Sequence, residues 1–393
     1  MNLLQQCLSS PWFTPVVTGL VVLALAPLVI GYLSLVERKV LADLQARYGP
    51  MRVGPHGLLQ PVADALKFLL KEDIIPSQAD RAVFLAAPLL SVFAALLGFT
   101  VLPGSRTIFI SNVNIGLLVV VSVSSLGVLG IIFGGWASNS HYPILGALRS
   151  AAQLVSYEVS LGLALLAGIT VAGTLNLQDI VEEQRAHHLW FLFSNYGAMI
   201  LPFVVYVIAS IAESNRLPFD LPEAESELVA GYHTEFSGFR WALYMLAEWA
   251  NVLVLSAVAV TLFLGGWLRP FANSEWLEIP LNLIFPLLSF AGLAIYCIVL
   301  ARKVRFRYEA VLLLAVAAIV LLAGLVFLIP ASRVEFAGLF WFFFKLTIFV
   351  YLVIWLRGTF PRVRYDQLMN FGWKWLIPVA LLGIAVNAAL GLL

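Results

Sequence analysis

The sequence predicts an all-α, polytopic integral membrane protein of about ten transmembrane helices. Hydrophobic residues make up 61% of the 393 residues, charged residues only 11%, and the mean hydropathy is +0.95. Soluble domains carry about a quarter charged residues, so this chain cannot build a surface that faces water. Stretches of roughly 20 apolar residues, long enough to cross a bilayer, also recur along the whole chain.

Ten such stretches are predicted to span the membrane. They lie at 15–36, 82–102, 115–136, 147–172, 196–212, 241–264, 280–300, 310–330, 336–356 and 373–392. The first does not resemble a cleaved signal peptide, because its first basic residues, Arg38 and Lys39, follow it. This pattern predicts an N-terminus on the outer side of the membrane. No soluble domain interrupts the series, so residues 1–393 are expected to form a single membrane domain.

The Lys and Arg residues are distributed unequally between the two sides that these spans create. Each span carries the chain to the other side of the membrane. On this basis, 18 of the 23 Lys and Arg residues lie on one side, in the segments 37–81, 137–149, 213–240, 301–309 and 357–374. The opposite side holds Arg106, Arg185, Arg269 and Arg333, and Lys345 lies inside a span. Because cytoplasmic loops carry the excess of Lys and Arg, the first group of segments is predicted to be cytoplasmic.

The polar segment 37–81 is predicted to fold back and then form an amphipathic helix. Gly49-Pro50 and Gly54-Pro55 are turn signals. From Pro61 onward, apolar residues recur at helical spacing on one face and polar residues on another. A plain interfacial helix with snorkelling lysines is the alternative on the pattern alone.

The polar segment 213–240 and its flanks are rich in acids. Seven of the 22 acidic residues lie here, namely Glu213, Asp220, Glu223, Glu225, Glu227, Glu235 and Glu248. Crowded carboxyl groups in a confined, low-dielectric place retain protons, so they can relay protons near neutral pH. A solvated acidic loop is the alternative, but interleaved apolar residues such as Phe219, Leu221 and Tyr232 indicate surface to bury.

Three ionisable residues are predicted to lie within the spans: Glu158, Glu248 and Lys345. Intramembrane charges are costly and mark functional sites by default. Each could instead be half of a structural pair, yet three together favour a polar path through the bundle. His141, His187, His188 and His233 show no metal-ligand spacing and are expected at the surface or in loops, so no metal site is predicted.

The composition also limits cofactors and partners. The two cysteines, Cys7 and Cys297, cannot ligate an iron–sulfur cluster, which usually takes about four thiolates. Any electron carrier is therefore expected on another chain. A net charge of +1 gives no electrostatic reason to expect nucleic acid as a partner.

Several motifs resemble the membrane subunit 1 family (the H-subunit family) of respiratory complex I, the proton-translocating NADH:quinone oxidoreductase. They are ERK at 37–39, QARYGPMRVG at 45–54, QP at 60–61 with Asp64 and Lys67, KED at 71–73, NRLPFDLPEAESE at 215–227, the following residues to Glu235, and PRVRYDQLM at 361–369. The resemblance covers almost the whole chain. In that family the chain forms the membrane end of the quinone tunnel and the start of an acidic proton path.

The resemblance implies roles for two groups of residues. It places at the quinone channel Glu37, Arg38, Arg47, Tyr48, Arg52, Asp64, Lys67, Phe219, Asp220 and Glu227. It places in the proton path Glu158, Glu213, Glu223, Glu225 and Glu248. Segment 37–81 would then be a cytoplasmic quinone-channel loop, and 213–240 a cytoplasmic acidic loop.

Two features depart from the family pattern. Phe236 stands where the family usually has Tyr in a TEYSG motif, so a hydroxyl group is missing there. Members typically have eight spans, so segment 280–330 resembles an inserted transmembrane hairpin.

The resemblance implies an enzyme subunit without its own redox centre, in the plasma (inner) membrane of a bacterium. Quinone would be the substrate, and FMN and iron–sulfur clusters would lie on partner subunits. Expected partners are the other complex I membrane subunits, the peripheral quinone-site subunits and membrane lipid. The homologous subunit of a membrane-bound hydrogenase or of a cofactor F420-linked dehydrogenase stays open as an alternative. A secondary transporter should show two halves with broken helices, and a structural anchor would not need the acidic cluster.

Overall fold

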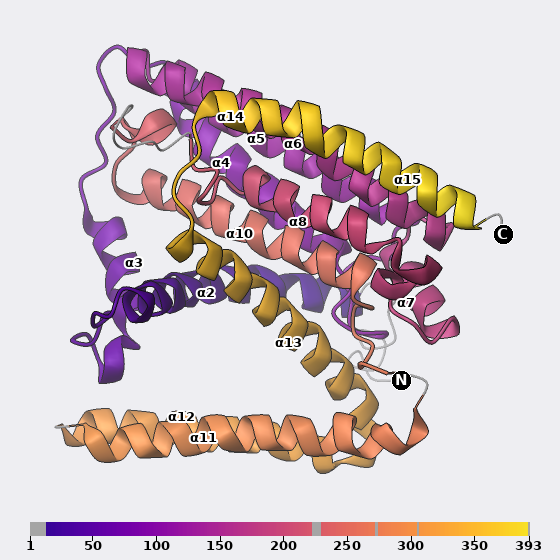
Figure 1. Ribbon diagram of the computed structural model, residues 1–393. Helices are drawn as coiled ribbons and strands as arrows, with labels where there is room; N and C mark the ends of the chain where they lie inside the picture. The colour runs from indigo at the N-terminus through magenta and orange to yellow at the C-terminus, as the bar shows by residue number, and fades with distance from the viewer. Residues whose placement is uncertain (1–12, 222–228, 272–273, 305, 392–393) are drawn as a thin grey trace, which may run out of the picture.

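The computed structural model describes residues 13–221, 229–271, 274–304 and 306–391, and their regular structure is entirely helical (Figure 1). The long helices are α2 (Phe13–Leu44), α4 (Arg81–Gly98), α5 (Gly116–Ala137), α6 (His141–Ala172), α10 (Gly238–Phe263), α11 (Phe285–Lys303), α12 (Arg307–Leu325), α13 (Pro330–Thr359) and α15 (Ile377–Gly391). With adjoining turns, nine helices in the described residues are long and apolar enough to cross a membrane. The predicted fold class, a polytopic membrane helix bundle, is confirmed.

Shorter helices and turns connect these long ones. The short α-helices are α3 (Gln60–Leu70), α7 (Leu177–Ala186), α8 (Ile200–Glu213) and α14 (Tyr365–Phe371). The short 3₁₀-helices are η1 (Pro55–Gly57), η2 (Phe99–Val101), η3 (Phe191–Phe193), η4 (Asn195–Gly197), η5 (Gly231–His233), η6 (Glu275–Leu277) and η8 (Val326–Leu328). Two π-helical segments are η7 (Pro280–Ile284) and η9 (Gly372–Leu376).

Helix α10 forms the centre of the bundle. Of its most apolar stretch, 89% is buried, compared with 11% for α2. It contacts α2, α4, α8 and α13, while α15 and α5 pack on α6. A helix that is apolar on all sides must be covered on all sides, either by protein or by lipid. Because α10 lies at the centre, its polar residues, including Glu248, face neighbouring helices and not lipid.

The predicted span 196–212 is shorter in the structure than expected. The chain turns at η4, and α8 then has 14 residues. At 1.5 Å per residue it is about 21 Å long, less than the hydrocarbon thickness of about 30 Å. The acidic segment that follows therefore begins inside the bundle, where Glu213, Ser214, Asn215 and Arg216 are all buried.

The first span is longer than predicted. Helix α2 continues to Leu44, so Glu37 and Arg38 lie on a helix and not in a loop. The chain then turns through η1, where a side chain on Gly57 (φ +77°) would meet the carbonyl of Pro50. It returns as the predicted amphipathic helix, α3, which contacts α2. No residue of α3 is buried: Val62, Leu66 and Leu69 are exposed, while the ring of Phe68 packs against that of Trp241 on α10 at 5.2 Å.

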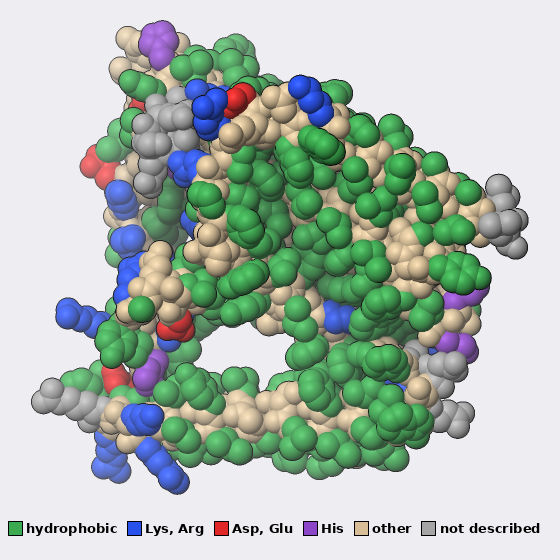
Figure 2. All heavy atoms as spheres, in the orientation of Figure 1, with side chains coloured by type: hydrophobic (Ala, Val, Ile, Leu, Met, Phe, Trp, Pro, Cys, Tyr) green, Lys and Arg blue, Asp and Glu red, His purple; other side chains and the backbone are tan. Residues whose placement is uncertain are grey.

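Helices α11 and α12 form a hairpin that lies beside the bundle (Figure 1). They pack against each other, and the hairpin joins the bundle through η7, η8 and α13 at one end. At its other end, α12 contacts η1. The turn between α11 and α12 is therefore at the same end of the molecule as α3. Figure 2 shows the Lys and Arg side chains gathered at this end, as the positive-inside pattern predicts.

Candidate functional site: a chain of buried charges

Arg216 is the central cation of the site. It follows the short helix α8, and its side chain is only 8% exposed. The guanidinium lies over the ring of Trp249 at 4.4 Å. The segment is anchored to α6 by Gln153, whose Nε2 donates hydrogen bonds to the carbonyls of Ala212 (2.8 Å) and Phe219 (2.7 Å). These bonds hold the beginning of the acidic segment in place.

Two acids from different helices flank Arg216. Its Nη1 lies 3.9 Å from Oε1 of Glu37 on α2, and its Nη2 lies 3.5 Å from Oε2 of Glu248 on α10. Arg357 of α13 pairs with the same oxygen of Glu37. Both acids are less than a tenth exposed. Such desolvated charges are tolerated because they are paired.

A small polar cavity continues the series beyond Glu248. Tyr232 donates a hydrogen bond of 2.9 Å to Oε1 of Glu248. The cavity, about 30 Å³ in volume, is lined by Glu248, Glu213, Tyr232 and Ser124 among others. This volume has room for one or two water molecules. Glu248 and Glu213 therefore face one shared, hydratable space.

Glu213 and Glu158 complete the series on the far side of this cavity. The Ser124 hydroxyl bonds the Glu213 carboxyl, and Glu158 is close enough to interact with it electrostatically. The Ser125 hydroxyl donates to Oε1 of Glu158 on α6. We call the set Glu37, Arg357, Arg216, Glu248, Glu213 and Glu158 the charge chain.

Asp220 and Phe219 lie next to the charge chain. Arg362 Nη2 donates a 2.9 Å hydrogen bond to Oδ2 of Asp220, which is buried. The ring of Phe219 lies 5.9 Å from that of Tyr157. The backbone N–H of Val363 bonds the carbonyl of Pro218. The motifs at 215–227 and 361–369 thus meet in space.

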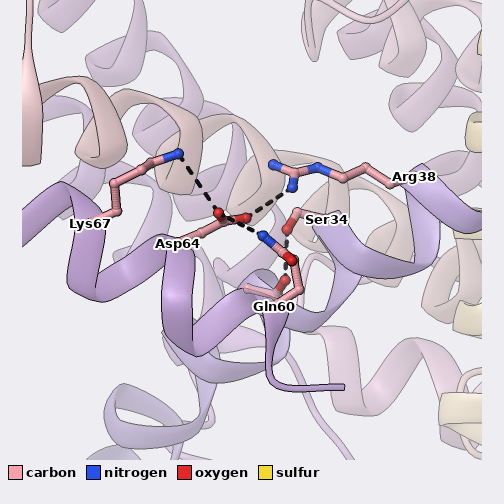
Figure 3. A network of polar contacts seen from close by, with 6 residues as sticks. Ser34, Arg38, Gln60, Asp64 and Lys67 are labelled. Carbon is pink, nitrogen blue, oxygen red and sulfur yellow. Dashed lines mark hydrogen bonds and ion pairs between the residues drawn. The ribbon is translucent and has the colours of Figure 1, made fainter. Parts of the chain in front are cut away.

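Asp64 of α3 is the centre of a second polar network (Figure 3). Arg38 Nη1 lies 2.9 Å from Oδ2 of Asp64, and Gln60 Nε2 donates to Oδ1 at 3.0 Å. Lys67 Nζ lies 3.7 Å from Oδ1. This network ties the amphipathic helix to the end of α2, one residue beyond Glu37.

The other predicted channel residues have different surroundings. Arg47, Tyr48 and Arg52 are exposed, Tyr48 by 91%. They lie on the surface at the basic end of the molecule, not in a pocket of this chain alone. Glu223, Glu225 and Glu227 lie outside the described residues.

A large apolar groove leads along the membrane-spanning part to the charge chain. It has a volume of about 540 Å³ and is lined by α2, α10 and α13 and by residues of the 99–110 segment. At one end its lining includes Val36 and Ile354, which are next to Glu37 and one turn from Arg357. We call it the apolar groove.

One sequence-based interpretation is wrong. Lys345 does not join the polar path: its Nζ donates to the carbonyls of Leu264 (2.6 Å) and Leu268 (2.9 Å), just beyond the end of α10. Leu264 is about 24 Å along the chain from Glu248 at helical rise. His233 lies in a loop, as expected, because it belongs to the turn η5, but its side chain is buried against the rings of Tyr232 and Trp241.

Sequence reasoning missed the partners of the acids. Arg216, Arg357, Arg362, Tyr232 and Gln153 were not assigned to the site, although the first three lie in or beside the quoted motifs. Among the described residues, no group of three or more His, Cys, Asp or Glu side chains could hold a metal ion.

The fold and the site define a polytopic membrane protein with a carboxyl–guanidinium series buried among its helices. A model of the NADH dehydrogenase family matches residues 17–331 and 308–388. The NADH-quinone oxidoreductase H-subunit of Solibacter usitatus (strain Ellin6076) that carries the number 2 is 58% identical over 390 residues, 99% of each chain. An H-subunit of the same enzyme from Koribacter versatilis (strain Ellin345) is 47% identical, over 95% of this chain and 90% of its own.

A more distant relative, the NADH-quinone oxidoreductase H-subunit of Rickettsia canadensis (strain McKiel), is 41% identical over 95% of this chain and 93% of its own. The chain therefore belongs to the NADH dehydrogenase family, the H-subunit family of NADH-quinone oxidoreductase. This membership removes the secondary-transporter alternative. The Solibacter match runs through 280–330, so that relative carries a counterpart of the hairpin.

Proposed function

We propose that this chain is the membrane subunit of a proton-translocating NADH-quinone oxidoreductase that guides quinone and begins its proton path. The observation that carries the proposal is the charge chain. It holds the four carboxyl groups of Glu37, Glu248, Glu213 and Glu158, against the guanidiniums of Arg216 and Arg357. Buried carboxylates in excess of their partners favour bound protons. Such a series can accept and release protons.

The apolar groove supplies the second half of the proposed function. A quinone tail is a long hydrocarbon, and an apolar groove at membrane depth offers it surroundings as apolar as the lipid that it leaves. One end of the groove is adjacent to Glu37. A quinone that moves along α2 would thus approach the Glu37–Arg357–Arg216 end of the charge chain. Reduction of quinone takes up protons with the electrons, and a change of charge on Glu37 would alter the balance of Arg216 between Glu37 and Glu248.

The electrons would come from partner subunits. Two cysteines are too few to hold an iron–sulfur cluster, so FMN and the clusters would reside on peripheral subunits. The exposed residues Arg47, Tyr48 and Arg52 give those subunits a basic surface to bind. We further propose a bacterial inner membrane with an external N-terminus. The names of the matched relatives favour this function over a hydrogenase or an F420-linked dehydrogenase.

The proposed quinone role is tested at Asp64. Asp64→Asn weakens the contacts with Arg38 and Lys67 that position α3 against α2. We expect quinone reduction by the assembled complex to fall several-fold, or its apparent KM to rise, while NADH oxidation with a hydrophilic artificial acceptor persists.

The matched control is Asp366→Asn, which removes a carboxylate from an exposed pair with Arg364 at the same end of the molecule. This variant should keep both activities. Equal loss of both activities in Asp64→Asn, at normal assembly, would refute the quinone role of this network.

A further inference from the structure

The hairpin exposes apolar side chains on most of its surface. Only 11% of the most apolar stretch containing α11 is buried, and 22% of that containing α12. Leu288, Ile319 and Leu322 are each about two-thirds exposed, at 65%, 66% and 64%. At membrane depth such side chains need hydrocarbon neighbours, because water there is excluded.

The hairpin is joined to the bundle at both ends. At the basic end α12 contacts η1, and Lys39 of α2 donates a hydrogen bond to the carbonyl of His56 in η1. At the other end Phe285 stacks on Trp341 of α13 at 5.4 Å. Between these two junctions Figure 2 shows an opening through the molecule, surrounded by atoms on all sides. We call it the window.

The bundle side of the window is formed by α2 and α13 (Figure 1), the helices that also line the apolar groove. Exposed side chains in the membrane-spanning part of α2, such as Leu20 (63%) and Leu28 (57%), are apolar. Both sides of the window therefore favour hydrocarbon. The two junctions close the window at both membrane surfaces, so a transmembrane helix of another subunit could not run through it from one side to the other. The geometry therefore favours a molecule that spans only one leaflet.

The end of the hairpin carries a basic cluster. Arg302 and Lys303 end α11, Arg307 begins α12, and all three are exposed. Beside them, the exposed rings of Phe306 and Tyr308 stack at 5.6 Å. Aromatic and basic residues together are typical of the lipid headgroup level, and clustered Lys and Arg attract anionic lipid.

We propose that the window holds an anionic phospholipid. Its acyl chains lie between the hairpin and the α2–α13 surface, and Arg302, Lys303 and Arg307 hold its phosphate. An uncharged quinone would gain nothing from this basic cluster, so dependence on charge separates the two occupants. The lipid would fill the space beside the groove and keep the hairpin at a fixed distance from it.

The test compares the lipid content of two double variants in the assembled, detergent-purified complex. Arg302→Gln with Arg307→Gln removes two charges of the cluster. The control, Arg81→Gln with Lys374→Gln, removes two exposed charges elsewhere on the basic end. Quantitative lipid mass spectrometry should show the loss of one tightly held anionic phospholipid per complex from the first variant, and none from the control.

Equal anionic lipid in both variants would overturn the proposal. If the first variant does not assemble, the wild-type complex is delipidated and incubated with brominated phosphatidylglycerol or brominated phosphatidylcholine. Bromine density in the window with phosphatidylglycerol, and much less with phosphatidylcholine, is the expected result. Equal density for the two lipids, or a protein helix in the window, would contradict it.

Discussion

Arg216 makes the buried acids of this bundle possible. An isolated charge transferred into a protein interior costs several kcal/mol, and pairing offsets that cost. Arg216 lies between Glu37 and Glu248, so one guanidinium compensates acids from two helices. Any change in the charge of one acid must therefore affect the other.

Sequence alone identified the acids but not their partners. Glu158 and Glu248 stood out because ionisable residues are rare within apolar spans. The importance of Arg357 could not be predicted, because it sits at the end of α13 and meets Glu37 only through the packing of α13 on α2. Tyr232 likewise reaches Glu248 through a turn, η5, that has no sequence periodicity.

Lys345 has a structural role at the residue scale. It satisfies two carbonyls just beyond the end of α10 and lies 4.9 Å from the ring of Trp190. Hydrogen bonds to a charged donor contribute about 1.5–3 kcal/mol each, partly offset by the desolvation of the lysine. We expect Lys345→Met to destabilise the subunit by about 3 kcal/mol but to leave quinone turnover per assembled complex unchanged. Thermal unfolding and turnover measure the two effects.

The exposed Lys374 provides the control for this prediction, since Lys374→Met should change neither quantity. Lost proton translocation in a fully assembled Lys345→Met complex would return this lysine to the proton path.

At the scale of elements, local turns determine where each helix within an apolar stretch begins and ends. The ten predicted spans correspond to nine long helices and the short α8 in the described residues. Hydropathy could not predict the late start of α8, because the turn at η4 depends on left-handed backbone at Asn195 and Tyr196. It also could not predict that α2 runs on to Leu44, since polar residues at the end of a span still favour helix.

The hairpin gives a prediction at this scale. Its loop before α11 and its turn before α12 should lie on opposite sides of the membrane. In a background with Cys7 and Cys297 replaced by Ser, single cysteines at Ser274 and Arg307 are treated with an impermeant maleimide in sealed inside-out vesicles. We expect labelling at position 307 and protection at 274, with the reverse in right-side-out vesicles. Labelling of both from one face would mean that α11 does not span.

At the scale of the whole molecule, the apolar groove reaches residues that neighbour the charge chain. The groove follows α2, α10 and α13 and ends beside Glu37, and the charge chain continues from there to Glu158 on α6. The family resemblance placed Glu37 in the quinone channel and Glu248, Glu213 and Glu158 in the proton path, and these assignments stay predictions. The window beside the hairpin was not predictable, because it depends on how far the hairpin stands from the bundle.

The central claim is that the charge chain carries protons, and Glu158 at its far end tests it best. Glu158→Gln keeps the shape of the side chain and can still accept the hydrogen bond from Ser125. It removes only the titratable proton. The control is Glu183→Gln, which changes an exposed acid paired with His187.

The decisive measurement is vesicle acidification, made on one preparation together with assembly level, artificial-acceptor rate and quinone-reductase rate. The account predicts that Glu158→Gln assembles normally and keeps the artificial-acceptor rate, yet loses quinone-linked turnover and acidification together, at least tenfold, or about 1.4 kcal/mol in barrier. The control should retain all four. Normal assembly with normal acidification in Glu158→Gln would contradict the account and remove Glu158 from the proton path.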